Sequence, residues 1–338
     1  MISSVSSREY RGAVALVLGA SGFIGRHVAD ALTARGALVV RAVRRDDGDL
    51  GGEVVETDLA MPGKARALVR SVRPAVTFNL AGYGVDRGER DERTAFRMNA
   101  EMVAELASAV AEFGDRQWPG ADLVHAGSAL EYGTATGDLA EDTVEQPTTI
   151  YGKTKLEGTR ILAQAAAEGS LKALTARLFT VYGPGEHGGR LLPSLIETAR
   201  SGVPAELTAG LQLRDFTYVE DVAEGLCRLG TARPHRGGIV NLATGRLTSV
   251  REFAEIAGAV LKIPRERMKF GTIPTRAEEM EHSAPCVERL RELTGWAPAV
   301  GIEEGIRRTL RFSERSQAGR TASDRAYRLT TALVEGEQ

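Results

Sequence analysis

The chain has 338 residues, of which 43% are hydrophobic and 26% are charged, and its formal net charge is −2. This composition is typical of a globular protein large enough for two domains or one large α/β domain. The near-neutral charge gives no basic surface for nucleic acid, and no apolar run approaches the roughly 20 residues that cross a bilayer. We therefore expect neither a nucleic-acid partner nor a membrane.

Two features indicate the compartment, namely the cysteines and the first residues. The histidines bear on metal binding. Cys227 and Cys286 lie far apart, which fits a reducing cytoplasm and gives no disulfide framework. The five histidines have no metal-ligand spacing, so we expect no metal site. The opening MISSVSSREYRG lacks the apolar segment of a signal peptide, and we interpret it as a loose tail. These features favour a cytoplasmic protein.

Strand-like apolar runs alternate with helical patterns over the first half of the chain. The shorter segments are continuous apolar runs typical of buried strands, and the longer ones have apolar residues at helical spacing. The predicted strands are 13–19, 38–43, 53–59, 74–82, 121–128 and 172–183, and the predicted helices are 22–36, 64–72, 92–114 and 151–169. Such alternation predicts right-handed βαβ units and a mostly parallel sheet.

The fold class that this order predicts is α/β, with a Rossmann doubly wound parallel sheet and a smaller, mostly C-terminal α/β substrate-binding domain. Glycine and proline cluster in YGPGEHGG and mark a break in the alternation. Short helices and strands follow, some of which should return to the main sheet. The expected boundaries are 12–180 with returning segments at about 215–245 for the dinucleotide-binding domain, about 181–214 and 246–312 for the substrate-binding domain, and 1–11 and 313–338 for the tails.

Three glycines lie in VALVLGASGFIGRHVADAL, between a strand and a helix. Gly19 can make the tight turn, Gly22 lets the backbone approach a pyrophosphate, and Gly25 lets the helix pack closely on the strand. The start of the helix then presents N–H groups and its positive dipole end to the anion. Because strand and helix are both present, we interpret the turn as a dinucleotide site. The other residues assigned to this turn are Ser21, Phe23 and Ile24.

The tip of the second strand is where a Rossmann protein distinguishes NAD from NADP. A carboxylate there bonds the ribose hydroxyls of NAD, whereas an arginine pairs with the 2′-phosphate of NADP. Arg44 and Arg45 occupy the tip, so NADP (NADPH) is favoured. NAD stays an alternative, because a shift of one or two residues puts Asp46 or Asp47 in that place and leaves the arginines solvated. Asp58, which ends the next strand, should bond the adenine amino group or cap a turn.

Tyr151 and Lys155 lie four residues apart in YGKTK and share one face of a helix. A free tyrosine, with a pKa of about 10, is a poor acid or base at neutral pH. A nearby ammonium stabilises the phenolate and lowers that pKa, which makes a usable proton donor or acceptor. Ser128 ends the preceding strand, where its hydroxyl can hold a carbonyl oxygen. We therefore predict a catalytic triad rather than a chance pair on a helix surface.

Together with these motifs, the segments NLAG, RLFTVYGPG, LRDFTYVEDVA and NLATG make the chain resemble the extended short-chain dehydrogenase/reductase family. The likeness is to its nucleotide-sugar epimerase, dehydratase and ketoreductase group, and it runs from GASGFIG to LTGWAPAVGIEEGIRRTL. The resemblance implies a Rossmann fold, a nicotinamide cofactor and a nucleotide-diphosphate sugar as substrate.

The resemblance also implies roles for residues outside the triad. Asn99 would support the catalytic helix or a water, and Phe179 and Thr180 would flank the nicotinamide and the sugar. Arg214 would grip the diphosphate, because a guanidinium fork matches phosphate oxygens; a salt bridge to a neighbouring aspartate is the alternative. The remaining implied contacts are Leu59, Leu80, Ala81 and Gly82 for the cofactor, with Tyr151 and Lys155, and Leu192 for the substrate, with Ser128.

Two departures from the family pattern bear on the reaction. Family dehydratases usually follow the strand-end Ser or Thr with adjacent Asp and Glu, which carry out the elimination of water. Ala129 and Leu130 stand here instead, and Glu131, one position later, should point elsewhere. Thr180 stands where the family often has Asn, which leaves the sugar contact open.

Three functions agree with these residues. The first is an NADPH-dependent reductase of a nucleotide-linked 4-keto-6-deoxyhexose, with Tyr151 as proton donor. The second is an NAD-dependent nucleotide-sugar 4-epimerase, and the third is a non-enzymatic NAD(P)-binding sensor. The arginine tip favours the reductase, and the intact triad disfavours the sensor. Apolar faces at about 95–112 and 151–167 resemble the family's dimer-forming four-helix bundle and predict a homodimer, although burial within a monomer gives the same pattern.

Overall fold

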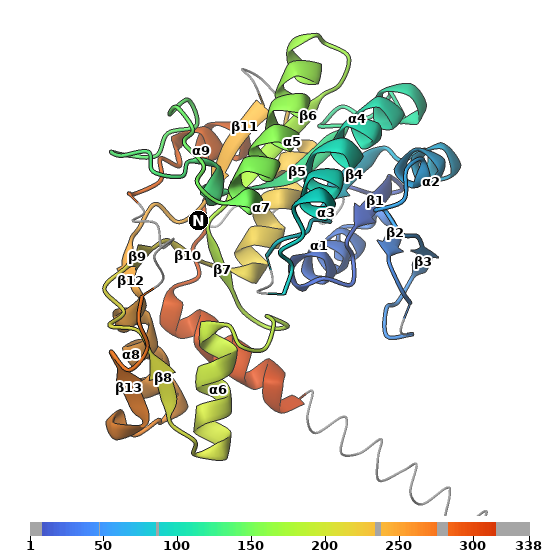
Figure 1. The fold of residues 1–338 in the computed structure, drawn as a ribbon. Coiled ribbons are helices and arrows are strands. Elements are labelled where there is room, and N and C mark those ends of the chain that lie inside the picture. Colours follow the sequence, from blue (N-terminus) through green and yellow to red (C-terminus); the bar gives the residue numbers. More distant parts are fainter. Residues whose placement is uncertain (1–8, 47, 86–87, 234–237, 276–282, 316–338) are drawn as a thin grey trace, which may run out of the picture. The chain divides into compact units, whose positions relative to one another are not determined.

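Figure 1 shows the fold of a computed structural model of the chain, which describes residues 9–46, 48–85, 88–233, 238–275 and 283–315. The chain divides into two compact units. Unit 1 comprises Met1–Val181, Leu211–Val250 and Thr275–Ala299, and unit 2 comprises Tyr182–Gly210, Arg251–Pro274 and Val300–Gln338. Asp47 and most of the two expected tails lie outside the described residues.

A seven-stranded sheet forms the centre of unit 1. Its order is β3-β2-β1-β4-β5-β6-β11, and all neighbouring strands run parallel. The strands are β1 (Val14–Leu18), β2 (Leu38–Val43), β3 (Glu53–Glu56), β4 (Val76–Asn79), β5 (Leu123–Ser128), β6 (Ala173–Leu178) and β11 (Ile239–Leu242). The chain reverses its direction of travel across the sheet between β1 and β4, which is the switch point where such sheets bind ligands. The predicted Rossmann fold is confirmed.

Helices cover both faces of this sheet (Figure 1), which explains why its strands are almost continuously apolar. The helices on one face are α1 (Phe23–Ala34), α7 (Val219–Thr231) and α9 (Glu288–Thr294), and those on the other are α2 (Lys64–Val72), α4 (Met102–Phe113) and α5 (Ile150–Ala167). Each helix buries one apolar stripe. On α1, for example, Val28 and Leu32 are fully buried, and each such side chain contributes about 1.5–3 kcal/mol.

Shorter elements complete unit 1. They are α3 (Glu92–Phe96), the π-helix η1 (Arg97–Glu101), the 3-10 turn η2 (Ala129–Glu131), most of β7 (Thr180–Tyr182), β9 (Leu213–Arg214), β10 (Phe216–Tyr218) and β12 (Thr248–Ser249). The strands among them form two small sheets, β10 with β7 and β12 with β9.

Unit 2 is a smaller α/β unit, as the sequence predicts. Its elements are α6 (Leu191–Ser201), β8 (Ala205–Leu207), most of α8 (Val250–Leu261), the 3-10 turn η4 (Arg265–Arg267), β13 (Met268–Phe270) and a helix at 302–315. β13 lies parallel to β8. Tyr182 packs edge-on against Phe253, with ring centroids 5.1 Å apart. Gly305 lets the last helix pass this tyrosine, because a Cβ atom there would lie 2.2 Å from the Tyr182 hydroxyl.

Three local features differ from the sequence expectations. The segment 92–114 is not one α-helix, because the π-helix η1 interrupts it between α3 and α4. The predicted strand at 172–183 is two strands in different sheets, β6 and β7, which break at Phe179. In the segment expected to be a loose tail, Tyr10 is fully buried and stacks on Trp118 at 5.4 Å, which fixes the chain just before β1.

Candidate active site

The glycine turn after β1 has the backbone that the motif requires. Gly19 adopts φ +74°, a conformation that favours glycine. A Cβ atom at Gly25 would lie 2.1 Å from the Gly19 carbonyl oxygen, so only glycine lets α1 pack this closely on the turn. The N–H of Gly19 donates to the Ala42 carbonyl at 3.1 Å, which ties the turn to the end of β2.

The first turn of α1 fits a phosphate group. It contains no acidic residue, and Gly22 at its N-cap supplies no side-chain hydrogen bond. Backbone N–H groups and the positive end of the helix dipole are therefore available to an anion. Phe23 and Ile24 pack against the core beneath the turn, while Ser21 is exposed. The donor set is the one that a dinucleotide pyrophosphate needs.

Arg44, Arg45 and Asp46 are exposed just beyond β2. Neither arginine takes part in an ion pair with any other described residue, so both can reach an anion. Asp46 Oδ1 accepts a hydrogen bond from the Gly48 N–H at 2.9 Å, so this carboxylate stabilises the turn that contains it. Asp58 does the same after β3, where its Oδ1 accepts from the Ala60 N–H at 3.0 Å. Its expected adenine contact stays a prediction.

Ser128 is the last residue of β5, and a capping box holds it there. Its Oγ accepts from the Leu130 N–H at 3.2 Å. In return, Glu131 Oε1 accepts from the Ser128 N–H at 2.7 Å. The second oxygen of Glu131 accepts from Arg177 Nε at 2.8 Å. Glu131 therefore points into the interior, where both of its carboxylate oxygens are bonded.

Tyr151 and Lys155 lie on α5, beside the loop that follows β4. The Tyr151 ring packs against Gly84, where a Cβ atom would lie 3.1 Å from the ring carbon Cδ2. The Lys155 Nζ lies 3.8 Å from the position of a Cβ atom on Gly82. Burial lowers the pKa of Lys155 to about 8, against the opposing charge of Glu131. Lys155 thus remains mostly an ammonium at neutral pH, although its proton is easier to remove than usual.

Asn99 lies in the π-helix η1 and braces this arrangement. Its Oδ1 accepts from the Tyr83 N–H at 3.1 Å, and its Nδ2 donates to the Tyr83 carbonyl at 2.8 Å and to Thr154 Oγ1 at 3.0 Å. A Cβ atom on Gly158 would lie 2.2 Å from the Asn99 carbonyl oxygen, so α5 approaches η1 closely. π-Helical turns often occur at functional sites. Asn99 therefore joins η1 to the first turn of α5 through its side chain.

His125 and Asn79 form a buried pair that the sequence did not suggest. They stand opposite each other on β5 and β4, and Asn79 Nδ2 donates to His125 Nδ1 at 3.0 Å. Burial, and then the charge of Lys155, hold the pKa of His125 well below its usual value, so the imidazole is neutral at pH 7. A neutral ring adds no repulsion to the nearby ammonium.

The remaining residues that the sequence predicts for the site lie in unit 1, except for Leu192. Phe179 is half-buried and lies 6.5 Å from the Tyr132 ring centroid. The Thr180 N–H donates to the Asp215 carbonyl at 2.9 Å. Arg214 pairs with Thr248 across β9 and β12. Leu192 belongs to unit 2, where it is fully buried in α6. The other placements are Leu59, which is buried, Leu80 and Ala81, which are half-buried after β4, and Gly82, which is exposed.

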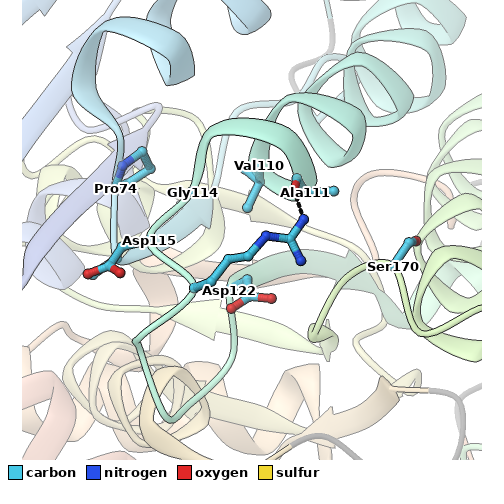
Figure 2. Close-up of a pocket in the computed structure, with 9 residues that line it drawn as sticks. Pro74, Val110, Ala111, Gly114, Asp115, Asp122 and Ser170 are labelled. Atoms are coloured by element: carbon cyan, nitrogen blue, oxygen red, sulfur yellow. Dashed lines mark hydrogen bonds between the residues drawn. The ribbon is translucent and has the colours of Figure 1, made fainter.

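Figure 2 shows a small pocket at the opposite edge of the sheet. Pro74 precedes β4, Asp122 precedes β5 and Ser170 precedes β6, so the pocket lies at the amino ends of the strands. Arg116 also lines it and donates to the Ala111 carbonyl. Ligands of doubly wound sheets bind outside the carboxyl ends, so this pocket is no candidate for the active site.

Comparison with known proteins identifies the family. The sequence profile of the "NAD dependent epimerase/dehydratase family" matches residues 15–243, more than half of the chain. The chain belongs to this family. The predicted membership in the extended short-chain dehydrogenase/reductases, with its nucleotide-sugar-modifying enzymes, is therefore confirmed.

Individual relatives are named for different reactions. A dTDP-6-deoxy-L-talose 4-dehydrogenase (NAD(P)(+)) from Kitasatospora kifunensis is 30% identical over 304 residues, 86% of this chain and 92% of that protein. A UDP-glucose 4-epimerase from Mycolicibacterium smegmatis is 30% identical over 321 residues, 88% of this chain and 97% of that protein. The structure of MoeE5 in complex with UDP-glucuronic acid and NAD has a TM-score of 0.77 and 28% identity, and the match covers 90% of this chain and all of MoeE5.

None of the helices in the described ranges is both long and apolar enough to cross a membrane. Over the same ranges, no three His, Cys, Asp or Glu side chains come together as a possible metal site.

Proposed function

We propose that the protein is an NADPH-dependent reductase of a nucleotide-linked 4-keto-6-deoxyhexose. The observation that carries the proposal is the position of three side chains at the carboxyl edge of the sheet. Ser128 ends β5, Tyr151 packs against Gly84, and the Lys155 ammonium lies beside Gly82. Both glycines belong to the loop after β4, which borders the switch point of the sheet.

The choice of reduction rests on three supports. Arg44 and Arg45 are exposed where the 2′-phosphate of NADP would lie. Ala129 and Leu130 supply no acid or base for the loss of water. The Kitasatospora relative is named as an NAD(P)(+) 4-dehydrogenase of a 6-deoxysugar nucleotide, and such a reaction run backwards reduces a 4-ketone.

The chain's own residues handle the carbonyl oxygen and its proton. When bound, NADPH supplies the hydride. Ser128 donates a hydrogen bond from Oγ to the carbonyl oxygen, and Tyr151 transfers its phenolic proton to that oxygen. The Lys155 ammonium stabilises the phenolate that remains. The hydrogen bonds of Asn99 fix the first turn of α5, so the phenol is positioned before the substrate arrives.

The test is an assay of the purified protein with NADPH and a dTDP-linked 4-keto-6-deoxyhexose. We expect one NADPH to be oxidised for each 4-hydroxyl formed, and NADPH to be used in preference to NADH. Conversion of a sugar nucleotide into its C4 epimer without net consumption of NADPH would overturn the reductase assignment.

The second candidate is an NAD-dependent nucleotide-sugar 4-epimerase. It is favoured by the Mycolicibacterium epimerase, which has the same 30% identity as the dehydrogenase, and by the NAD held in MoeE5. An epimerase returns the hydride to the opposite face of the same carbon and therefore regenerates its cofactor. Protein that retains NAD through gel filtration and interconverts UDP-glucose and UDP-galactose without added cofactor would select this function.

A further inference from the structure

Glu131 is a buried glutamate whose two carboxylate oxygens both accept hydrogen bonds. Its side chain is fully buried, and so is that of its partner Arg177. Glu131 Oε1 accepts from the Ser128 N–H at 2.7 Å, and its Oε2 accepts from Arg177 Nε at 2.8 Å. Both carboxylate oxygens are therefore used, one by the end of β5 and the other by Arg177, next to the carboxyl end of β6.

The Arg177 guanidinium is in turn held on several sides. Its Nη2 donates to Glu145 at 2.7 Å, and its carbon Cζ lies 4.4 Å from the centroid of the Tyr132 ring. A buried arginine with these partners cannot leave its position without losing all of them. Through this guanidinium, Glu131 is fixed to the sheet, and through Glu131 so is the backbone of Ser128.

The carboxylate of Glu131 also interacts electrostatically with Lys155. The negative charge of Glu131 favours the ammonium, which burial disfavours. The other titratable groups around Lys155 are Tyr151 on the same helix, the neutral His125 on β5, Tyr83 beside Asn99, and Arg177, which pairs with Glu131. Among these groups, Glu131 supplies the carboxylate whose charge favours the ammonium.

We propose that Glu131 is a positioning residue for the proton transfer, which fixes Ser128 through its backbone N–H and places a buried negative charge whose field reaches Lys155. This proposal rests on the proposed roles of Ser128, Tyr151 and Lys155, but it does not depend on which sugar nucleotide is the substrate. It gives Glu131 a role different from that of the glutamate in dehydratases, because its carboxylate contacts Ser128 and Arg177 from within the core.

Three variants test the proposal. Glu131→Gln removes the charge at nearly constant volume. Glu131→Asp keeps the charge but shortens the reach by one methylene, so it cannot bond Ser128 and Arg177 together. Glu145→Gln is the matched control, because Glu145 bonds the same guanidinium from a side chain that is 20% exposed. Circular dichroism verifies the fold of each variant.

The first readout is an absorbance titration of the phenolate in cofactor-free protein, corrected with Tyr151→Phe. We expect the coupled Tyr151–Lys155 titration to move to lower pH by about one pH unit in Glu131→Gln. Glu131→Asp and Glu145→Gln should stay within about 0.3 pH units of the wild type. The second readout is kcat, which should fall about tenfold in Glu131→Asp with KM unchanged.

Each result decides one part of the proposal. A wild-type titration in Glu131→Gln, or an equal shift in Glu145→Gln, overturns the electrostatic role. A wild-type kcat in Glu131→Asp overturns the positioning role. If Glu131→Gln does not fold, Glu131→Asp decides alone, because its titration must stay in place while kcat falls. The titration needs no substrate, so an inactive wild type would contradict the proposed reductase while the titration still decides the electrostatic role of Glu131.

Discussion

Asn99 and Thr154 are joined by a hydrogen bond of 3.0 Å between Nδ2 and Oγ1, and Thr154 donates onward to the Tyr151 carbonyl at 3.1 Å. The π-helix and the first turn of α5 are thereby connected through side chains. Tyr151 lies in that turn. The backbone that carries its phenol is therefore fixed by these hydrogen bonds, in addition to the packing of the ring. Pre-positioning of this kind lowers the entropy that the reaction must overcome.

Tyr151→Phe should abolish the proton transfer while it leaves the cofactor site intact. The ring packs against Gly84 and keeps that contact as phenylalanine. We expect turnover to fall by at least about a hundredfold, the scale of general acid catalysis. Turnover is measured by NADPH oxidation and cofactor binding by fluorescence titration. Near-normal turnover in this variant would remove Tyr151 from its assigned role.

Arg44→Ala combined with Arg45→Ala should weaken the binding of NADPH more than that of NADH. Both guanidinium groups are exposed beyond β2, and an arginine pairs with a phosphate in a bidentate manner. We expect Kd for NADPH to rise at least about tenfold, with little change for NADH. Arg70→Ala, an exposed arginine on α2, is the control. Equal losses for both cofactors would show that these arginines do not bind the 2′-phosphate.

Much of the fold is predictable because the two kinds of element differ in their sequence pattern. Buried parallel strands are continuous apolar runs, whereas amphipathic helices have apolar residues at helical spacing. The helix α2 begins at Lys64 and ends at Val72, as its pattern predicts. The π-helix at Arg97–Glu101 was not predicted, since RMNAE continues the apolar spacing of an α-helix. The Asn99 carbonyl of this π-helix lies 2.2 Å from the position of a Cβ atom on Gly158, a tertiary contact that the local sequence does not reveal.

The candidate site, too, could be predicted only in part from the sequence. Tyr151 and Lys155 could be found because helical geometry relates residues four apart. The link from Glu131 to Arg177 spans 46 residues, and local spacing carries no information on it. One signal was present, since an arginine inside the apolar strand β6 indicates a buried partner. The sequence could not say which carboxylate that partner would be.

Lys155→Met should stabilise the cofactor-free protein at pH 7 while it abolishes turnover. Burial lowers the pKa of Lys155 from 10.5 to about 8, so the unfolded chain holds more protons than the folded one between these values. Stability therefore rises with pH across this window, and the cost of the buried ammonium is complete below about pH 8. We expect a gain on the order of 2 kcal/mol at pH 7. Lys153→Met, on the exposed side of α5, is the control.

Thermal unfolding at several pH values measures this effect. The difference between Lys155→Met and the wild type should narrow as pH rises above about 8, where the wild-type lysine loses its proton. A difference that stays constant from pH 7 to alkaline pH would show that packing, and not the charge, causes the change in stability.

Phe96→Asp should dissociate the predicted homodimer. Phe96 is 46% exposed at the end of α3, and Ile150 is 42% exposed at the start of α5. A second copy of these helices would cover both apolar side chains. We expect the wild type to sediment as a dimer at micromolar concentration and the variant as a monomer. Phe312→Asp, which changes a phenylalanine that is 39% exposed, should leave the dimer intact. A monomeric wild type would contradict the four-helix interface.

Glu186→Gln should stabilise the protein in a pH-dependent manner. Glu186 Oε2 is buried with no hydrogen-bond partner among the described residues, and Oε1 lies 3.6 Å from Arg190 Nε. Burial raises the pKa of Glu186 from 4.5 to about 7, despite the charge of Arg190. The folded protein thus holds more protons than the unfolded chain between these values, and stability falls as pH rises through them. A neutral glutamine avoids that loss.

We expect Glu186→Gln to raise the free energy of unfolding on the order of 2 kcal/mol at pH 8 and to change it little at pH 5. Urea unfolding at both pH values gives the two differences directly. Glu197→Gln, at an exposed position on α6 in the same unit, should be neutral at both. The protonated acid and the amide differ little in shape, so removal of the charge should matter only where Glu186 is ionised. An equal gain at pH 5 and pH 8 would therefore mean that ionisation of Glu186 does not limit stability.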